Sequence, residues 1–198
     1  MRKLIVEEWI SLDGYAADRN GTTDFFPSTE ENRYSDEDQL RFLEGIDTIL
    51  LGRKTYDLFV DFWPTDKSKQ EIIAPRLNEI RKVVFSNTIK NASWGKWPDA
   101  TVVPGDAVDA VRNMKQDKGK SIVLWGSISL TQALMKADLI DEYHIQIIPI
   151  RLGAGRLLFP QEEENKELRL IGNKMYEATG VMYLKYVPNI HKPIPKSK

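Results

Sequence analysis

The sequence predicts a single α/β domain whose sheet is mixed and mostly parallel. Short β-branched runs alternate with segments of helical periodicity through most of the chain, a pattern typical of βαβ units. After residue 141 no clear helical segment separates the strands, which favours antiparallel strands at the C-terminal end. The chain has 198 residues, 41% of them apolar and 29% charged, so it can bury one sizeable core.

The strands are expected where short runs of Val, Ile and Leu are bounded by polar or turn residues. They span residues 3–10, 48–51, 82–86, 100–103, 121–125, 143–148 and 181–187, with an eighth candidate at 168–174. Helical periodicity predicts the helices between them, at residues 35–44, 55–60, 70–80, 106–117 and 127–137. The last helix is expected to pack on one face of the sheet, because one stripe carries Ile128, Leu130, Ala133, Leu134 and Ala137.

The segments between these elements set the expected domain bounds. Residues 14–34 and the surroundings of 94–98 are expected to be long loops, and a loop as long as the first usually carries function or covers a site. Residues 1–187 are expected to form one domain. Residues 188–198, rich in proline and lysine, are expected to form a flexible tail.

The composition excludes several classes of function. The net charge is −1, and no basic cluster is interleaved with aromatic residues, so nucleic acid is not an expected partner. The absence of cysteine excludes disulfides and thiolate metal sites and fits a reducing compartment. We expect a cytoplasmic protein without a membrane partner, because neither a secretory signal nor an apolar run of 18 residues occurs. No metal site is expected, since His144 and His191 are far apart and no zinc motif is present.

The strongest signal for a ligand site follows the expected strand at 48–51, where Gly52, Arg53, Lys54 and Thr55 open a helix. A strand, a tight turn and a helix N-terminus together favour an anion, because free backbone N–H groups and the helix dipole point at it. Thr55 can donate its hydroxyl, and the Arg53 guanidinium suits phosphate oxygens. The alternative, in which Gly52 only turns the chain and both bases are solvated, stays open.

A second strand-to-helix junction repeats this arrangement at Gly126, Ser127 and Ile128. Gly126 permits close backbone approach, and Ser127 is placed to cap the helix that follows. A plain N-capped helix is the alternative. Ser86 and Asn87 end a third strand, and the carboxyl ends of parallel strands meet at one edge, where open α/β sheets bind ligands. Together the three strand ends predict a phosphate-bearing cofactor.

These motifs, with Ser11-Leu12-Asp13-Gly14 and Gly153-Ala154-Gly155, resemble the dihydrofolate-reductase superfamily. Within it, the chain is most similar to the C-terminal reductase domain of bifunctional riboflavin-biosynthesis proteins, over about residues 2–187. The resemblance implies a three-layer α/β/α fold, NADPH as the cofactor and a homodimer. It also implies direct hydride transfer to a small heterocyclic or sugar-phosphate substrate.

The resemblance assigns roles to the three strand ends. Arg53 would face the adenosine 2′-phosphate and Thr55 the pyrophosphate. Gly126 and Ser127 match a glycine pair under the pyrophosphate, with serine in place of the second glycine. The cofactor-binding residues that it implies are Gly52, Arg53, Lys54, Thr55, Ser86, Asn87, Gly126, Ser127 and Ile128.

The resemblance also assigns the substrate side. Asp13 would lie beside nicotinamide and substrate and supply a proton, directly or through water, although Asp-Gly is also a common turn dipeptide. Ser11 would bind the carboxamide or the substrate, or be an exposed strand-end serine. Gly153 would line the nicotinamide side, or belong to a flexible turn. Trp63 is expected at the rim of the cleft, with a core position as the alternative.

Dihydrofolate reductases carry an acid on the first helix, where this chain has Asp36, Glu37 and Asp38. We interpret these acids structurally, with Ser35 as the N-cap, favourable charges in the first turn and Asp38 completing a capping-box-like pair. Two alternatives to a riboflavin-type reductase remain. One is a non-catalytic dinucleotide-binding module, and the other is a pterin reductase, which methotrexate would protect against thermal unfolding.

Overall fold

The structure, a computed structural model, describes residues 1–160 and 166–189, and only the backbone of residues 29–32 and 34. Within this part of the chain, a nine-stranded sheet has the order β10-β11-β8-β1-β7-β3-β4-β6-β5. Its strands are β1 (Leu4–Ser11), β3 (Ile46–Gly52), β4 (Arg81–Phe85), β5 (Ala92–Trp94), β6 (Trp97–Val103), β7 (Ser121–Trp125), β8 (Glu142–Ile148), β10 (Leu168–Tyr176) and β11 (Val181–Pro188). The strands from β8 to β6 are parallel neighbours. At the ends of the sheet β11, β10 and β5 are antiparallel, so the predicted mixed sheet is confirmed.

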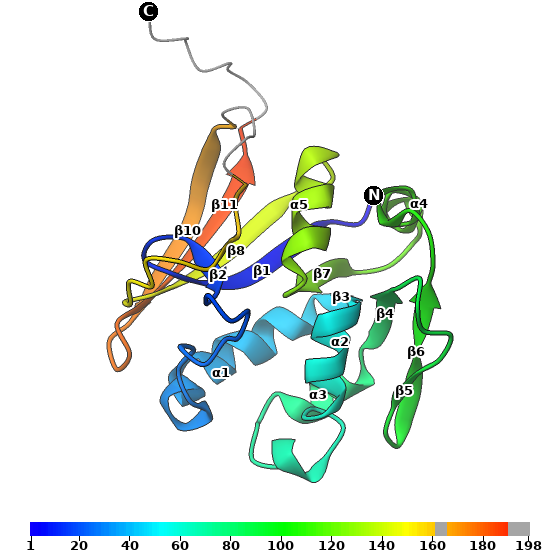
Figure 1. Cartoon of the computed structure of the whole chain (residues 1–198), viewed down its shortest axis with the longest axis horizontal. Helices are drawn as coiled ribbons and strands as arrows, with labels where there is room; N and C mark the ends of the chain where they lie inside the picture. Colours follow the sequence, from blue (N-terminus) through cyan, green and yellow to red (C-terminus); the bar gives the residue numbers. More distant parts are fainter. Residues whose placement is uncertain (161–165, 190–198) are drawn as a thin grey trace, which may run out of the picture.

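Helices cover both faces of this sheet and complete three layers (Figure 1). They are α1 (Thr29–Glu44), α2 (Arg53–Val60), α3 (Ala74–Glu79), α4 (Ala107–Gln116) and α5 (Ile128–Lys136). The face under α1, α2 and α3 buries an apolar cluster that includes Leu43, Tyr56 and Leu77. The opposite face packs Val111 of α4 and Leu134 of α5 against the sheet. Most of the apolar stripe predicted for the last helix packs on this face as expected, with Leu130 and Leu134 buried and Ile128 and Ala137 partly buried, whereas Ala133 is exposed.

Several short strands were not predicted from the periodicity of the sequence. Strands β2 (Tyr15–Ala17) and β9 (Arg156–Leu157) pair with each other outside the main sheet, because two or three residues are too few to show alternation. The loop expected around residues 94–98 is instead the turn of a β5–β6 hairpin, in which Trp94 pairs with Trp97. The long loop expected at 14–34 is also wrong in part, since β2 and the first residues of α1 lie within it.

The helix bounds differ from the prediction at two places. Helix α1 begins at Thr29 and not at Ser35, because its first turns lack the apolar spacing that reveals a helix. Helix α3 is shorter than expected and begins at Ala74, where Pro75 occupies the first turn that proline tolerates.

Strand β11 runs to Pro188, past the predicted strand end at residue 187, and the Asn189 N–H donates to the Glu167 carbonyl at 2.9 Å. The rest of the predicted tail, with His191, lies outside the described residues.

Candidate functional site

The parallel strands bring most of the predicted site residues to one edge of the sheet. Strands β1, β7, β3, β4 and β8 all point the same way, so the segments that follow them share their carboxyl-end edge. These segments carry Ser11 and Asp13, Gly126 to Ile128, Gly52 to Thr55, Ser86 and Asn87, and Gly153. Segments that are far apart in the chain therefore lie at one edge of the sheet, as the predicted parallel strands imply.

Trp63 is the exception. It follows the C-terminal end of α2, whereas the edge lies at the N-terminal end of that helix. Its ring centroid lies 6.2 Å from that of Phe59 and 5.2 Å from that of Phe62, and it packs against the apolar cluster under α1 to α3. Trp63 is therefore part of the apolar packing, as in the alternative that we gave for it, and we no longer assign it to the substrate site.

The junctions after β3 and β7 are joined by one side chain, that of Ser127. Its hydroxyl oxygen accepts a hydrogen bond from the Gly52 N–H at 2.5 Å and lies 2.8 Å from the Thr55 hydroxyl. These two groups are donors that we expected a phosphate to use. Ser127 reaches them from a left-handed backbone conformation with φ of 58°, which is uncommon for a residue with a side chain.

The predicted side-chain cap of α5 is wrong. Ser127 is the N-cap residue by position, but its side chain makes no hydrogen bond to the helix that it precedes. The hydroxyl is instead committed to the neighbouring junction, because β3 and β7 are adjacent in the sheet. Ser127 thus does not supply the side-chain acceptor that we predicted for the first amides of α5.

Both glycines are required by the close approach of the two turns. A Cβ atom on Gly52 would lie 2.8 Å from the Ser127 hydroxyl oxygen. A Cβ atom on Gly126 would lie 2.8 Å from the Thr55 hydroxyl oxygen, and Gly126 also has a φ of 58°. The two turns form a cradle in which any larger residue would displace a polar group.

Arg53 keeps part of its hydrogen-bonding capacity free. Its Nη1 donates to the Asp57 carboxylate at 3.0 Å, across one turn of α2. Its Nε is buried and has no partner among the described residues. Lys54 is exposed beside it. An unpaired guanidinium N–H beside a glycine cradle fits a phosphate-bearing cofactor, and these are the residues that would hold NADPH.

Ser86 and Asn87 fasten the loops of the same edge. The Asn87 carboxamide oxygen accepts from the Gly105 N–H at 2.7 Å, which ties the segment after β4 to the segment after β6. The Ser86 hydroxyl accepts from the Thr88 N–H at 3.2 Å. These contacts of Ser86 and Asn87 within the chain are structural.

Asp13 clamps two loops that are far apart in sequence. Its carboxylate accepts from the Ser11 hydroxyl at 2.7 Å, from the Leu152 N–H at 3.1 Å and from the Gly153 N–H at 2.7 Å. The hydrogen bond from Ser11, followed by those from the two amides, lowers the pKa of Asp13 to about 2. The carboxyl is therefore ionised at neutral pH, which opposes the proton-donor role that we predicted for it.

Ser11 is likewise engaged inside the protein. It is fully buried, donates to Asp13 and accepts from the Tyr15 N–H at 3.0 Å. The alternative of an exposed strand-end serine is wrong, and the hydroxyl orients Asp13. Gly153 contributes its N–H to the same clamp and has a φ of 73°, a conformation that glycine adopts at no steric cost.

Sequence reasoning missed two consecutive acids in the centre of β1. Glu7 and Glu8 are 3% and 5% exposed, and burial raises the pKa of both carboxyls. The Glu7 carboxylate accepts from the Trp125 indole N–H at 2.6 Å and from the Gln39 carboxamide at 2.8 Å. The available signal was a pair of charges inside an otherwise apolar strand. Because Trp125 directly precedes Gly126, a titratable acid is bonded to the strand end that forms the cradle.

The N-cap and first-turn explanation that we gave for the acids on α1 is wrong. Ser35 lies inside α1 and not at its start, so the acids do not occupy the first turn. Asp36 is buried, and burial raises its pKa. For Asp38, burial alone would raise the pKa, but hydrogen bonds from Lys174, Arg41 and Tyr176 lower it to about 2.

Two further findings concern the described residues only. Across residues 1–160 and 166–189, no helix has the length and apolar character needed to cross a membrane. The same part of the chain contains no group of three His, Cys, Asp or Glu side chains arranged to hold a metal ion. His144 is bonded to the Tyr183 hydroxyl at 2.8 Å and to the Glu142 carboxylate at 3.0 Å.

Comparisons with known proteins agree on one family. The model of the RibD C-terminal domain matches residues 2–182. The uncharacterized protein YwjB of Bacillus subtilis (strain 168) is 30% identical over 188 residues, covering 93% of this chain and 98% of that protein. A solved structure from Shewanella sp. PV-4, assigned by its name to riboflavin biosynthesis, is 26% identical with a TM-score of 0.73 and covers 94% of this chain and 99% of that chain.

Two more distant structures support the fold alone. A diaminohydroxyphosphoribosylaminopyrimidine deaminase/5-amino-6-(5-phosphoribosylamino)uracil reductase from Thermotoga maritima has a TM-score of 0.64 at 14% identity, over 94% of this chain and 56% of that chain. Dihydrofolate reductase from Enterococcus faecalis, solved with NADP(H), has a TM-score of 0.61 at 13% identity, over 94% of this chain and 96% of that chain. The dihydrofolate-reductase-like fold expected from the motifs is confirmed.

Proposed function

The chain belongs to the RibD C-terminal domain family, and we propose that it is a cytoplasmic, NADPH-dependent reductase of a small heterocyclic or sugar-phosphate substrate. The family is of the reductase type, and a structural neighbour is named as a 5-amino-6-(5-phosphoribosylamino)uracil reductase. A ribosylamino-pyrimidine phosphate, whose sugar would be reduced to the ribityl form, is therefore the first substrate to test.

The observation that carries this proposal is the cradle formed by the two adjacent junctions. Gly52 and Gly126 leave room for the Ser127 and Thr55 side chains to meet between the two turns, which places two hydroxyl groups at the strand ends. The Arg53 guanidinium holds a buried N–H that has no partner in the described part of the chain. A 2′-phosphate would satisfy this donor, which would favour NADPH over NADH.

The remaining residues of the edge would orient the reaction. When bound, NADPH supplies the hydride for a polarised C=N or C=O carbon. The clamp of Asp13 on Leu152 and Gly153 holds the segments after β1 and β8 in a fixed relation, which reduces the cost of aligning a bound substrate. Glu7 retains its proton to a higher pH than an ordinary glutamate, so we assign it, and not Asp13, as the group that stores a proton near this edge.

The test is calorimetric titration with NADPH and NADH of the unmodified protein and of Arg53→Ala. We expect the variant to weaken NADPH binding by about 10- to 100-fold, since hydrogen bonds to charged groups contribute roughly 1.5–3 kcal/mol, and to change NADH binding little. Asp57→Asn is the matched control, because it removes the partner of Arg53 in α2 and keeps the guanidinium. Equal losses for both nucleotides would remove Arg53 from the 2′-phosphate role. Failure of the unmodified protein to bind either nucleotide would refute the reductase proposal.

A second candidate is a non-catalytic dinucleotide-binding module. The position of the Ser127 hydroxyl on the Gly52 N–H favours it, because a phosphate would have to displace this contact. The two candidates differ in turnover. A reductase oxidises NADPH when a ribosylamino-pyrimidine phosphate is added, whereas a binding module leaves the bound NADPH unchanged.

A further inference from the structure

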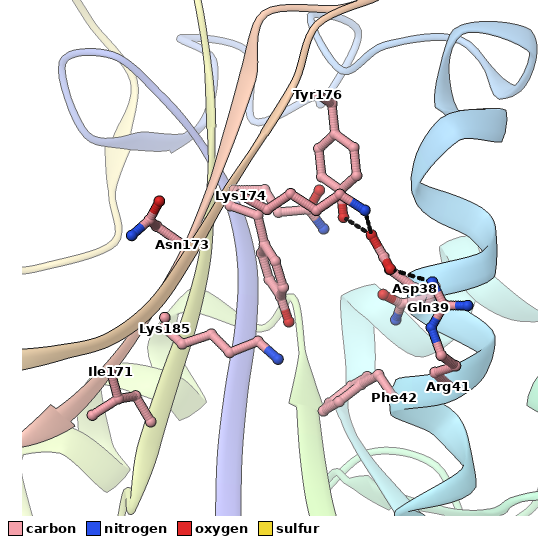
Figure 2. Close-up of a pocket in the computed structure, with 12 residues that line it drawn as sticks. Asp38, Gln39, Arg41, Phe42, Ile171, Asn173, Lys174, Tyr176 and Lys185 are labelled. Carbon is pink, nitrogen blue, oxygen red and sulfur yellow. Dashed lines mark hydrogen bonds and ion pairs between the residues drawn. The ribbon is translucent and has the colours of Figure 1, made fainter.

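A second cavity, separate from the carboxyl-end edge, opens between α1 and the C-terminal hairpin of β10 and β11 (Figure 2). Its volume is about 480 Å³, within the usual range of small-molecule sites. Helix α1 forms one wall, and β8, β11 and β10 form the other. None of the residues predicted for the cofactor or the substrate lines it.

The charged side chains that line this cavity give it a positive excess. Arg41, Lys174 and Lys185 stand against one acid, Asp38. Asp38 already pairs with both Arg41 and Lys174 and accepts from the Tyr176 hydroxyl at 3.0 Å. Asp38 is therefore shared by two cations, of which Arg41 also lies 3.7 Å from the Glu37 carboxylate, and Lys185 stays without an acid of the lining beside it.

Lys185 is the cation with the least compensation. No acid among the described residues lies within ion-pair distance of it, and its ammonium lies 5.2 Å from the centre of the Tyr183 ring. Figure 2 shows its chain extending from the hairpin toward α1, into the space beside Phe42. The Lys185 charge acts on Glu7, an acid that accepts a hydrogen bond from the Gln39 carboxamide. A cation that lines a cavity without an ion-pair partner among the described residues is placed to attract an anion.

Gln146 adds an independent indication of a ligand. Its side chain lines the cavity, is 5% exposed, and has a carboxamide oxygen without a hydrogen-bond partner among the described residues. A buried polar atom without a partner costs stability, and such atoms are rare in folded proteins. This oxygen is closed to solvent, so a ligand that donates an N–H or O–H would satisfy it once the Gln146 side chain turns toward the cavity.

The hairpin wall is shaped at Gly172. The β10–β11 register shifts between Leu170 and Gly172, and Gly172 faces Lys185 across the pair. A Cβ atom on Gly172 would make an ordinary 3.7 Å contact with the Lys185 side chain. The missing side chain thus leaves room in the cavity, at the kind of strand irregularity that often borders binding sites.

We propose that this cavity binds a small organic anion that also carries a hydroxyl group. Its carboxylate or phosphate lies against Lys185 and Lys174, and its hydroxyl donates to the Gln146 carboxamide oxygen. The site is independent of the proposed reductase activity, because it shares no residue with the cofactor cradle.

The test is calorimetric titration of the full chain, without nucleotide, with citrate, malate, glycerol phosphate and inorganic phosphate. Sodium chloride at matched ionic strength controls for general salt effects. We expect saturable binding of at least one hydroxyl-bearing anion that exceeds binding of inorganic phosphate. The carboxylate and phosphate members of the panel distinguish the two kinds of head group.

Two variants locate the binding. Lys185→Gln should weaken it by about tenfold or more, as expected for loss of a charged hydrogen bond. Gly172→Val fills the cavity at a strand position that accepts a side chain, and should weaken binding at least as much. Lys136→Gln, at an exposed lysine of α5, is the matched control and should leave binding unchanged. Absence of saturable binding, or equal binding by Lys185→Gln and Lys136→Gln, would overturn the proposal. The unfolding midpoint of each variant without ligand shows that it is folded.

Discussion

Replacing Ser127 with glycine should tighten the binding of NADPH. In the unmodified protein the Ser127 hydroxyl accepts from the Gly52 N–H at 2.5 Å and contacts the Thr55 hydroxyl at 2.8 Å. A phosphate oxygen that uses these two donors must first displace the serine. The variant removes this competition and leaves both donors free.

The size of the effect follows from the two contacts. Each hydrogen bond contributes a net of about 0.5–1.5 kcal/mol, so releasing both costs about 1–3 kcal/mol. NADPH should therefore bind about 5- to 150-fold more tightly to Ser127→Gly. The free energy of unfolding should fall by less than the two hydrogen bonds suggest. Glycine relieves a left-handed conformation that costs roughly 1–2 kcal/mol for a residue with a side chain.

Calorimetric titration of the purified variants with NADPH measures this change. Ser127→Ala is the matched variant, because it removes the hydroxyl and keeps the Cβ atom and the backbone strain. If the hydroxyl is the competitor, both variants tighten binding by similar factors. Weaker or unchanged binding in both would show that Ser127 supports the cofactor and would refute the reasoning.

Three further predictions concern stability and assembly. Glu8→Leu should raise the free energy of unfolding by about 1–3 kcal/mol. The gain should grow as pH rises above 4.5, because Glu8 then ionises in the unfolded state but not in the folded state, where its pKa is raised, and the unmodified protein loses stability. Urea unfolding of both proteins at several pH values measures this difference, and a gain that shrinks with rising pH would contradict it. Gly126→Ala should cost at least about 1–2 kcal/mol in the same assay, since its Cβ would meet Thr55 and its φ is 58°, and an unchanged midpoint would contradict the cradle geometry. We propose a homodimer that pairs through the edge strand β10, where Met175 is 54% exposed. In sedimentation experiments the unmodified protein should therefore be a dimer and the Met175→Lys variant a monomer.

The fold could be predicted because its signals are local. Strand β7 occupies the predicted residues 121–125, and the other predicted strands differ from the observed ones by a few residues at their ends, whereas β5 was not predicted. Alternation of β-branched runs with helical segments implies parallel strands, and parallel strands share a carboxyl-end edge. That edge was therefore available from sequence before any contact was known.

The use of each side chain at that edge could not be predicted in the same way. The bonds of Asp13 to Leu152 and Gly153 join segments about 140 residues apart, and nothing near Asp13 in sequence reveals them. The hydroxyl of Ser127 looked like a local cap, but the packing of β7 beside β3 offered it a better partner. Glu7 and Glu8 had a visible signal, since two acids inside an apolar strand require an explanation.

The central position of β1 has a consequence for how the protein is made. Leu4 is synthesised well before the residues with which its strand pairs, Ile122 of β7 and, through Ile5, Glu142 of β8. At roughly 5–20 residues per second, these partners leave the ribosome on the order of 10 s later. Until then an apolar strand with two buried acids has no neighbour on either side. The nascent chain therefore passes through a long interval in which chaperones, and not its own sheet, must keep β1 from associating with other chains.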